Sequence, residues 1–273
     1  MRIYKVLMVL FLPLAAFASS PVVTPTLLEF LKEMKISHDG TLSSIVDATQ
    51  SAGWQRPLQV ERWQVPDLSV EQRGMVLSYA VKLGMLETRY PKNNHYHYLV
   101  VMGGATFRME KRMGFLKELW NKGCRFDHIV ILSGERPLDP KVEKIPDGCK
   151  SESEAAHAMW KTIDLPPEVR NLPITFVDTP MIPVYMGQRR PGIADTITKW
   201  VKTSPKPGSC LIISNQPYIS YQEATIRLLL PKSFTLEAVG PGAVPAELNA
   251  ADILDSIARW LYQEQQLPKN NKR

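Results

Sequence analysis

Five short apolar segments between residues 98 and 242 alternate with longer segments of helical pattern, and this order constrains the fold more than any other feature. The apolar segments, at 99–102, 129–132, 174–177, 211–213 and 234–239, have the length of buried strands. Helices are expected at 107–122, 152–163, 193–201, 220–230 and from 249 to about 263. Strands joined by helices pair in parallel, because each connection must cross over the sheet. The sequence therefore predicts an α/β fold with a mostly parallel sheet of about five strands flanked by helices.

The first residues have the pattern of a secretory signal peptide. Arg2 and Lys5 precede an apolar run over residues 6–17, and Ala16-Phe17-Ala18 supplies the small residues of a cleavage site. A membrane anchor is the alternative, but crossing the bilayer takes about 20 apolar residues, and this run is shorter. We expect residues 1–18 to be removed and the remaining chain, without a transmembrane segment, to be a soluble protein that is periplasmic or secreted.

The charge of the expected mature chain is modest. Loss of Arg2 and Lys5, with no acidic residue in 1–18, lowers the net charge from +6 to +4. The basic residues are spread along the chain, apart from a tail at 266–273, and no aromatic-rich basic motif is present. We therefore expect no nucleic-acid partner.

The sequence before the first strand is helical in pattern. Apolar residues recur at helical spacing after Thr24, and a second helix is expected after Ser69. We expect an N-terminal helical region at 19–92, the α/β domain at 93–265 and a basic tail at 266–273. Trp54 and Trp63 lie between the two expected helices, and packing is their expected role, with contact to a ligand or a partner as the alternative.

If the chain is exported, two of its three cysteines are able to form a disulfide. Cys124 and Cys149 flank the second strand and its following loop, so a disulfide between them is feasible in an oxidising compartment, and free thiols are the alternative. Cys210 lies inside an apolar strand and is expected to be a buried core thiol.

Glycine and polar residues follow the predicted strands, where open α/β sheets bind their ligands. Gly103 and Gly104 end the first strand and are suited to present backbone amides to an anion at the next helix, with Arg108 further along that helix. They do not complete a G-x-G-x-x-G fingerprint, so a dinucleotide site is not predicted. A tight turn without a ligand is the alternative.

The second strand ends at Ser133 and Gly134 and opens a loop to about residue 150, which is long enough for a lid or a binding loop. Glu154 and His157 then lie on one face of the next helix, as an acid–base pair does. Ser151 and Glu154 also have capping-box spacing, so helix capping is the alternative for Glu154.

Metal binding and serine hydrolysis are weaker hypotheses. His95 and His97 point to one side of an extended segment, but surface histidines explain them, and no further ligand cluster supports a metal site. Ser133 and Ser214 each end a strand outside a G-x-S-x-G motif. We therefore predict no metal and no serine triad.

The order of these motifs resembles the DUF218 family over about residues 97–262. The match consists of Gly103-Gly104 after a strand, Arg108 in the next helix, Ser133-Gly134 after a strand, and then Ser153-Glu154-Ala155. The resemblance implies a Rossmann-like sheet with a polar pocket at its carboxyl edge and a role in maintenance of the bacterial cell envelope. It specifies no cofactor for this chain.

The chain departs from the family pattern after the fourth strand. In Ser214-Asn215-Gln216-Pro217-Tyr218-Ile219, isoleucine stands where the family has histidine, and the arginine expected next is missing. Asn215, Gln216 and Arg227 are the residues available as substitutes.

These observations predict an exported envelope protein that binds an anionic or nucleotide-like small molecule. The candidate ligand-binding residues are Gly103, Gly104, Arg108, Ser133, Gly134, Asn215 and Gln216, and Glu154 is the candidate catalytic base. The alternative is a non-catalytic scaffold that binds another protein, in the periplasm or in a host. The sequence leaves open whether the protein is an enzyme.

Overall fold

The computed structural model describes residues 22–57 and 60–270. The expected signal peptide lies outside these residues, as does the end of the basic tail. None of the helices in the two described segments is both long enough and apolar enough to cross a membrane.

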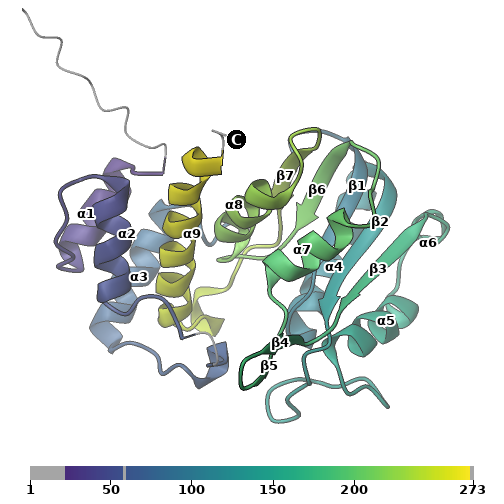
Figure 1. The fold of residues 1–273 in the computed structure, drawn as a ribbon, viewed down its shortest axis with the longest axis horizontal. Helices are drawn as coiled ribbons and strands as arrows, with labels where there is room; N and C mark the ends of the chain where they lie inside the picture. Colours follow the sequence, from purple (N-terminus) through teal and green to yellow (C-terminus); the bar gives the residue numbers. More distant parts are fainter. Residues whose placement is uncertain (1–21, 58–59, 271–273) are drawn as a thin grey trace, which may run out of the picture.

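Five parallel strands form the central sheet, in the order β3-β2-β1-β6-β7 (Figure 1). The strands are β1 (His95–Met102), β2 (Arg125–Gly134), β3 (Ile174–Thr179), β6 (Ser209–Ile213) and β7 (Thr235–Val239). In the register, Leu99 of β1 lies opposite Ile129 of β2 and Leu211 of β6. The prediction of an α/β, Rossmann-like fold with a five-stranded parallel sheet is confirmed.

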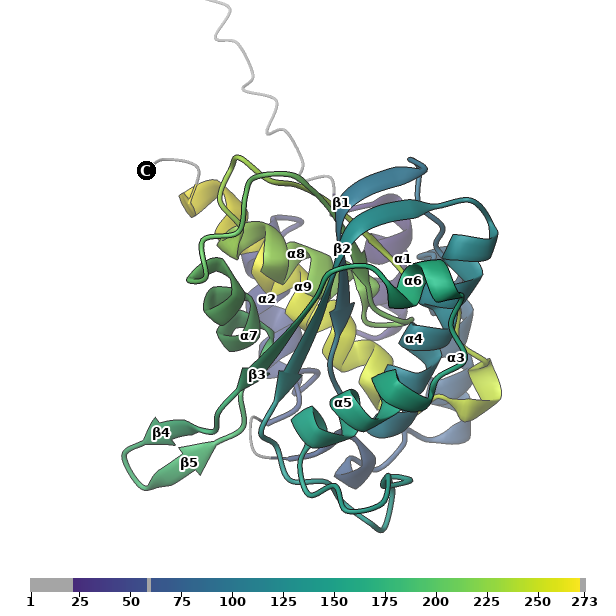
Figure 2. The same ribbon diagram turned by 90° about the vertical axis from the view of Figure 1, so that its right-hand side faces the viewer.

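Helices cover both faces of the sheet (Figure 2). Apolar residues of α4 (Thr106–Asn121) and α5 (Glu152–Thr162) pack on one face, close to the short helix α6 (Pro167–Arg170), and α7 (Ile193–Val201) and α8 (Ile219–Leu229) pack on the other. Leu99 and Val101 belong to the first core, and Val100 and Met102 to the second. The strands read as unbroken apolar runs because both sides of the sheet are buried.

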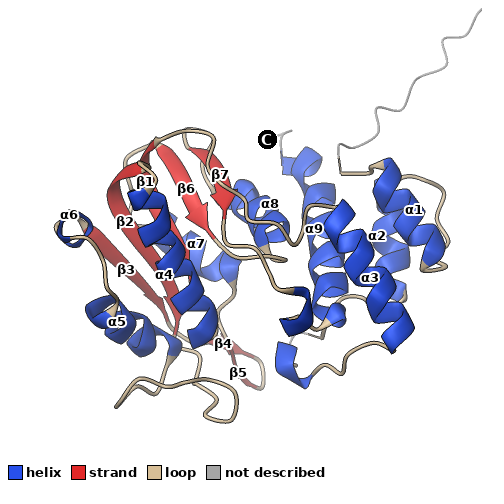
Figure 3. Ribbon diagram, turned by 180° about the vertical axis from the view of Figure 1, so that it is seen from behind, coloured by secondary structure: helices blue, strands red, loops and turns tan. Residues whose placement is uncertain are grey.

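A third core lies in a helical part beside α8 (Figure 3). It joins α1 (Pro25–Glu33), α2 (Leu42–Ser51) and α3 (Val70–Lys82) with α9 (Ala250–Asn270), and the 3₁₀ turns η1 (Arg62–Gln64) and η2 (Pro245–Glu247) lead into it. The two helices expected after Thr24 and Ser69 are present, and these residues cap them, since Thr24 accepts from the Leu27 amide and Ser69 from the Gln72 amide. The N-terminal helices therefore form one core with the C-terminal helix, and do not fold around a core of their own.

Trp54 belongs to this helical core, with its ring 5.5 Å from that of Phe30, whereas Trp63 is half-buried. The packing role that we expected for Trp54 is confirmed. A docking surface built on Trp54 is excluded, because the side chain is buried.

The feasible disulfide between Cys124 and Cys149 is absent from this structure, and both thiols are free, as in the alternative that the sequence left open. Cys124 is buried immediately before β2, while Cys149 lies in the loop after it. The two residues therefore lie at opposite ends of β2. A strand of this length spans roughly 30 Å, which is too far for a disulfide. Cys210 is fully buried as predicted, and burial raises its pKa to about 12.

Candidate functional site

The strand order reverses direction between β1 and β6. From β1 the chain continues to β2 and β3 on one side, and β6 and β7 lie on the other. Open α/β sheets bind ligands at the carboxyl ends of the two strands that flank such a reversal. In this sheet these ends are Met102-Gly103-Gly104 and Ile213-Ser214-Asn215, which we call the crevice.

Arg112 of α4 lies in the crevice and joins its two sides. The guanidinium donates to Asn215 Oδ1 from Nε at 3.0 Å and from Nη2 at 2.7 Å, and it donates from Nη1 to the carbonyls of Met102, at 2.8 Å, and Gly103. The side chain is 2% exposed, and burial together with the nearby Arg108 lowers its pKa to about 10. Within the described segments it forms no salt bridge. Its hydrogen-bond partners are neutral oxygens, and the Glu152 carboxylate acts on its charge only through space.

Glu152, at the start of α5, contacts the same turn from the other side. A Cβ atom placed on Gly103 would overlap Glu152 Oε1 and the Leu132 carbonyl, so only glycine fits there. Glu152 Oε2 accepts from Arg136 Nε at 3.1 Å. Burial raises the pKa of Glu152, and the charge of Arg136 opposes this rise only in part.

The N-terminus of α4, where we expected an anion, is occupied by a carboxylate of the protein itself. Glu143, from the loop at 135–150, accepts from the Thr106 amide at 3.1 Å and from the Asp139 amide at 3.0 Å. Arg136 adds two hydrogen bonds to the same carboxylate, at 2.8 and 2.9 Å. Burial disfavours the charge, but these hydrogen bonds outweigh it and lower the pKa of Glu143.

Arg108 lies one turn before Arg112, at the rim of the crevice. It donates to the Tyr218 hydroxyl at 3.1 Å, and that hydroxyl donates to Asp252 Oδ2 at 3.0 Å. Arg62 binds the other oxygen of Asp252 at 3.3 Å. The rim is thus a hydrogen-bonded network that ties the α/β part to α9 and η1.

Of the remaining predicted ligand-binding residues, some lie in the crevice and others do not. Asn215 is in the crevice, but the Gln216 amide donates to the Gly84 and Glu87 carbonyls and so holds the connection between α3 and β1. Gly134 packs against Pro191. Ser133 is buried and donates to Asp178 Oδ1 at 3.0 Å, on the side of a separate pocket.

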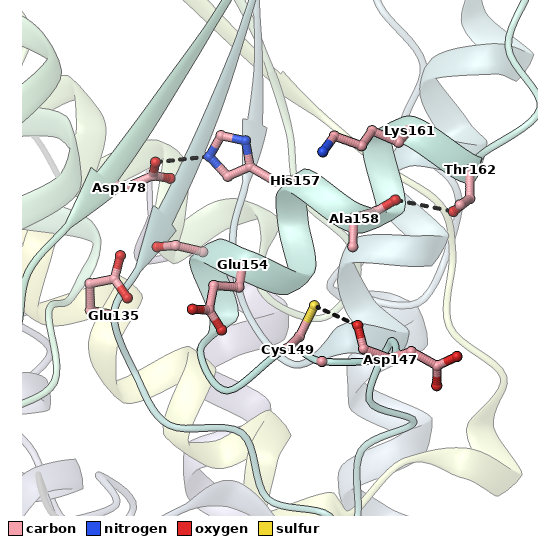
Figure 4. A pocket seen from close by; sticks show the side chains of 11 residues that line it. Glu135, Asp147, Cys149, Glu154, His157, Ala158, Lys161, Thr162 and Asp178 are labelled. Carbon is pink, nitrogen blue, oxygen red and sulfur yellow. Dashed lines mark hydrogen bonds and ion pairs between the residues drawn. The ribbon is translucent and has the colours of Figure 1, made fainter.

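That pocket lies beside α5, at the ends of β2 and β3 (Figure 4). Its residues include Glu135, Glu154, His157 and Asp178, and His157 Nε2 lies 2.8 Å from Asp178 Oδ2. Asp178 stands between Ser133 and His157, whereas a serine nucleophile needs the histidine as its neighbour. The arrangement is therefore not a serine triad.

Glu154 lines this pocket but forms the capping box of α5. Its Oε2 accepts from the Lys150 amide at 2.5 Å and from the Ser151 amide at 3.2 Å, and Ser151 accepts from the Glu154 amide at 3.3 Å. These backbone hydrogen bonds lower the pKa of Glu154. A lowered pKa and an exposed position favour the capping alternative over a general base.

Sequence comparison adds no family assignment. None of the protein-family models matches the chain, and no curated protein is significantly similar to it. The resemblance to the DUF218 family therefore remains a prediction.

Sequence reasoning missed Arg112, Glu152, Arg136 and Glu143. The signal for the first two was available, because Arg112 is one turn from Arg108 on the same helix, and Ser151-Glu152 repeats the Ser-Glu pair of Ser153-Glu154. No local pattern indicates Arg136 and Glu143. The fold of the loop at 135–150 brings these two side chains together.

Proposed function

We propose that the protein binds a small anionic molecule in the crevice between β1 and β6. The observation that carries this proposal is Arg112, a buried guanidinium whose partners are the oxygens of Asn215, Met102 and Gly103 and not a carboxylate. A buried charge without a salt bridge is costly, and buried groups with a perturbed pKa cluster at functional sites. A phosphate or carboxylate is the natural partner, because both match the guanidinium fork.

The surroundings favour an anion for a second reason. Arg108 is close enough to Arg112 to depress its pKa, so the two positive charges add at one point of the crevice. Only one carboxylate, Asp252 at 3.8 Å, lies within salt-bridge distance of Arg108 among the described residues. Anionic and nucleotide-like molecules therefore remain the proposed class of ligand.

Glu152 is the group of the crevice that is best suited to proton transfer. It is buried against Gly103, and its pKa is raised, whereas Glu154 is exposed and has a lowered pKa. In this proposal Glu152 takes the role that the sequence suggested for Glu154.

Arg112 and Asn215 are buried in this structure, so a ligand reaches them only after a rearrangement. The loop at 135–150 closes the side next to Thr106 through Glu143 and Arg136. We propose that this loop opens when the ligand enters, as the prediction of a lid implied. The signal-peptide pattern and the resemblance support a location in the cell envelope and a role in its maintenance.

Thermal denaturation of the purified protein with a panel of anions tests the proposal. The panel contains phosphate, pyrophosphate, nucleotides, sugar phosphates and peptidoglycan fragments. A ligand at about 100 times its Kd stabilises the folded state by roughly 2.7 kcal/mol. We expect at least one such hit, and we expect Arg112→Met to abolish it.

Two further variants separate charge from structure. Arg112→Lys keeps the charge without the fork and should weaken the hit, and Lys111→Met removes a charge from the exposed side of the same helix and should leave it unchanged. An equal hit in wild type and a folded Arg112→Met variant would place the anion elsewhere.

A protein-binding scaffold is the second candidate function, and one observation favours it. The hairpin formed by β4 (Ile182–Val184) and β5 (Gly187–Arg189) projects from the sheet (Figure 2). At its tip Tyr185 is 101% and Met186 89% exposed. If the anion panel gives no hit, partner capture by wild type but not by a Tyr185→Ser, Met186→Ser variant would support the scaffold, and equal capture by both would exclude this hairpin.

A further inference from the structure

The pocket beside α5 is separate from the crevice and has a different chemistry. It is an open pocket of about 580 Å³, a volume in the range of small-molecule sites. In Figure 4, His157 and Asp178 face each other at one end, and Glu135 and Glu154 lie near the start of α5. The crevice arginines do not line it.

The charges of the pocket are mostly negative. Four carboxylates line it, from Glu135, Asp147, Glu154 and Asp178, against the single lysine Lys161. Lys161 stands one turn beyond His157 on α5 and forms no salt bridge to these four carboxylates. A cationic ligand is therefore favoured, and an anion is disfavoured.

Two of the four carboxylates are already used by the protein. Asp178 accepts from Ser133 and pairs with His157, and Glu154 accepts the capping amides. Within the described part of the chain, the side chains of Glu135 and Asp147 take part in no hydrogen bond or salt bridge. They are free to accept from a ligand.

A buried hydroxyl points to the same conclusion independently. Ser153 lines the pocket and is only 2% exposed, yet its Oγ has no hydrogen-bond partner within the described residues. An unsatisfied buried hydroxyl is costly, so such groups are rare in folded proteins. A ligand group at this position would satisfy it.

The end of the pocket formed by His157 and Asp178 is held in place by packing and hydrogen bonding. The His157 ring stacks on Phe176 with centroids 3.8 Å apart and planes 18° from parallel, and Asp178 holds its Nε2. Packing and hydrogen bonding thus fix the imidazole in one place. A ligand meets a preformed wall here, and little order is lost on binding.

We propose that this pocket binds a small organic cation that carries a primary ammonium group. The ammonium donates to the Glu135 carboxylate and to Ser153 Oγ, and the body of the ligand lies along His157 and Ala158. An ammonium supplies three donors and no acceptor, which matches a pocket that is rich in acceptors. The proposal is independent of anion binding in the crevice.

Titration calorimetry with paired probes tests it. The purified protein is titrated with 1,4-diaminobutane and with glucosamine, and in parallel with their uncharged counterparts, 1,4-butanediol and glucose. We expect at least one amine to bind about tenfold or more tightly than its counterpart, since a charge-assisted hydrogen bond is lost in the latter. The tighter amine identifies an aliphatic or a sugar ligand.

Three variants locate the binding. Glu135→Gln should weaken the amine about tenfold or more, whereas Glu168→Gln, which removes an exposed carboxylate of α6, should not. Arg112→Lys should also leave amine binding unchanged, which distinguishes this pocket from the crevice. In NMR spectra the His157 imidazole signals should shift with the same concentration dependence as the heat. Equal binding of amines and alcohols, no binding of either, or an unchanged Kd in Glu135→Gln overturns the proposal.

Discussion

Gly103 is the residue of the crevice with the least space for a side chain. A side chain there would overlap a carbonyl of β2 and the Glu152 carboxylate, and a backbone carbonyl inside a sheet does not move aside. We expect Gly103→Ala to lower the free energy of unfolding by about 1–3 kcal/mol, measured by urea denaturation.

Gly114 provides the matched control. It lies inside α4, and an added Cβ would meet no atom within 4 Å. Gly114→Ala should stabilise the protein by about 0.5–1 kcal/mol, because alanine is the better helix former. If both variants were equally stable, the close packing at Gly103 would be wrong.

The two buried glutamates of the crevice should respond to pH in opposite directions. The pKa of Glu143 is lowered, so the stability that it contributes is present above its unfolded value of about 4.3 and is lost as the pH falls through the folded pKa. The pKa of Glu152 is raised, so folding gains stability as the pH falls from above the folded pKa toward about 4.3.

Urea denaturation between pH 3 and pH 7 measures both effects. Relative to Glu143→Gln, the wild type should lose stability below about pH 4.3, after an advantage of about 2 kcal/mol at neutral pH. Relative to Glu152→Gln, it should gain stability as the pH falls from 7 toward 4.3. Parallel pH profiles for the three proteins would contradict the assigned shifts.

At this scale the sequence identified the right helices but not the right side chains. Arg108 and Arg112 are one turn apart on α4, and only packing determines that the second is buried against Asn215. Glu152 and Glu154 differ by two positions, about 200° around a helix, so one is buried and the other is exposed. A single sequence does not give the rotation of a helix with this precision.

At the scale of elements, the sheet was predictable because buried parallel strands carry a local signal. The apolar pattern correctly placed all five strands and the helices α4, α5, α7 and α8. The last predicted helix, α9, begins one residue later than expected and extends to Asn270. Helix α2 and the hairpin of β4 and β5 were missed. Leu42–Ser51 is rich in serine and threonine, which are weak helix formers, and the two hairpin strands are three residues each.

The tip of the β4–β5 hairpin is expected to contribute little to the free energy of unfolding. Its tip residues Tyr185 and Met186 are exposed and contribute no core packing. The double variant Tyr185→Ser, Met186→Ser should keep the free energy of unfolding within about 0.5 kcal/mol of wild type. A loss of 2 kcal/mol or more would show that the tip is buried in the folded protein.

For the whole molecule, the determining fact is that α9 completes the core of the N-terminal helices. This packing could not be predicted from the sequence, because no local pattern connects residues 22–86 with residues 250–261. Asp252 of α9 also contacts Tyr218 and Arg62, so the helical part is linked to the rim of the crevice. The boundary expected near residue 92 does not separate two independent cores.

Ile257 tests this coupling. It is fully buried in the core that α9 shares with the N-terminal helices. We expect Ile257→Ala to lower the free energy of unfolding by about 2–5 kcal/mol, measured by urea denaturation. Tyr262, which is exposed on the same helix, is the control, and Tyr262→Ala should change stability by less than about 0.5 kcal/mol. Similar losses in both variants would contradict the packing of α9.

NMR of the arginine side chains can show whether an anion binds at Arg112. The Arg112 Nε–H signal is identified by its disappearance in Arg112→Lys, and the protein is then titrated with the anion that gives the largest thermal shift. We expect a saturable shift of this signal with the Kd of binding, whereas the signal of Arg259, which is paired with Asp255 in the helical part, should not move. Binding that leaves the Arg112 signal unmoved would contradict the proposed site.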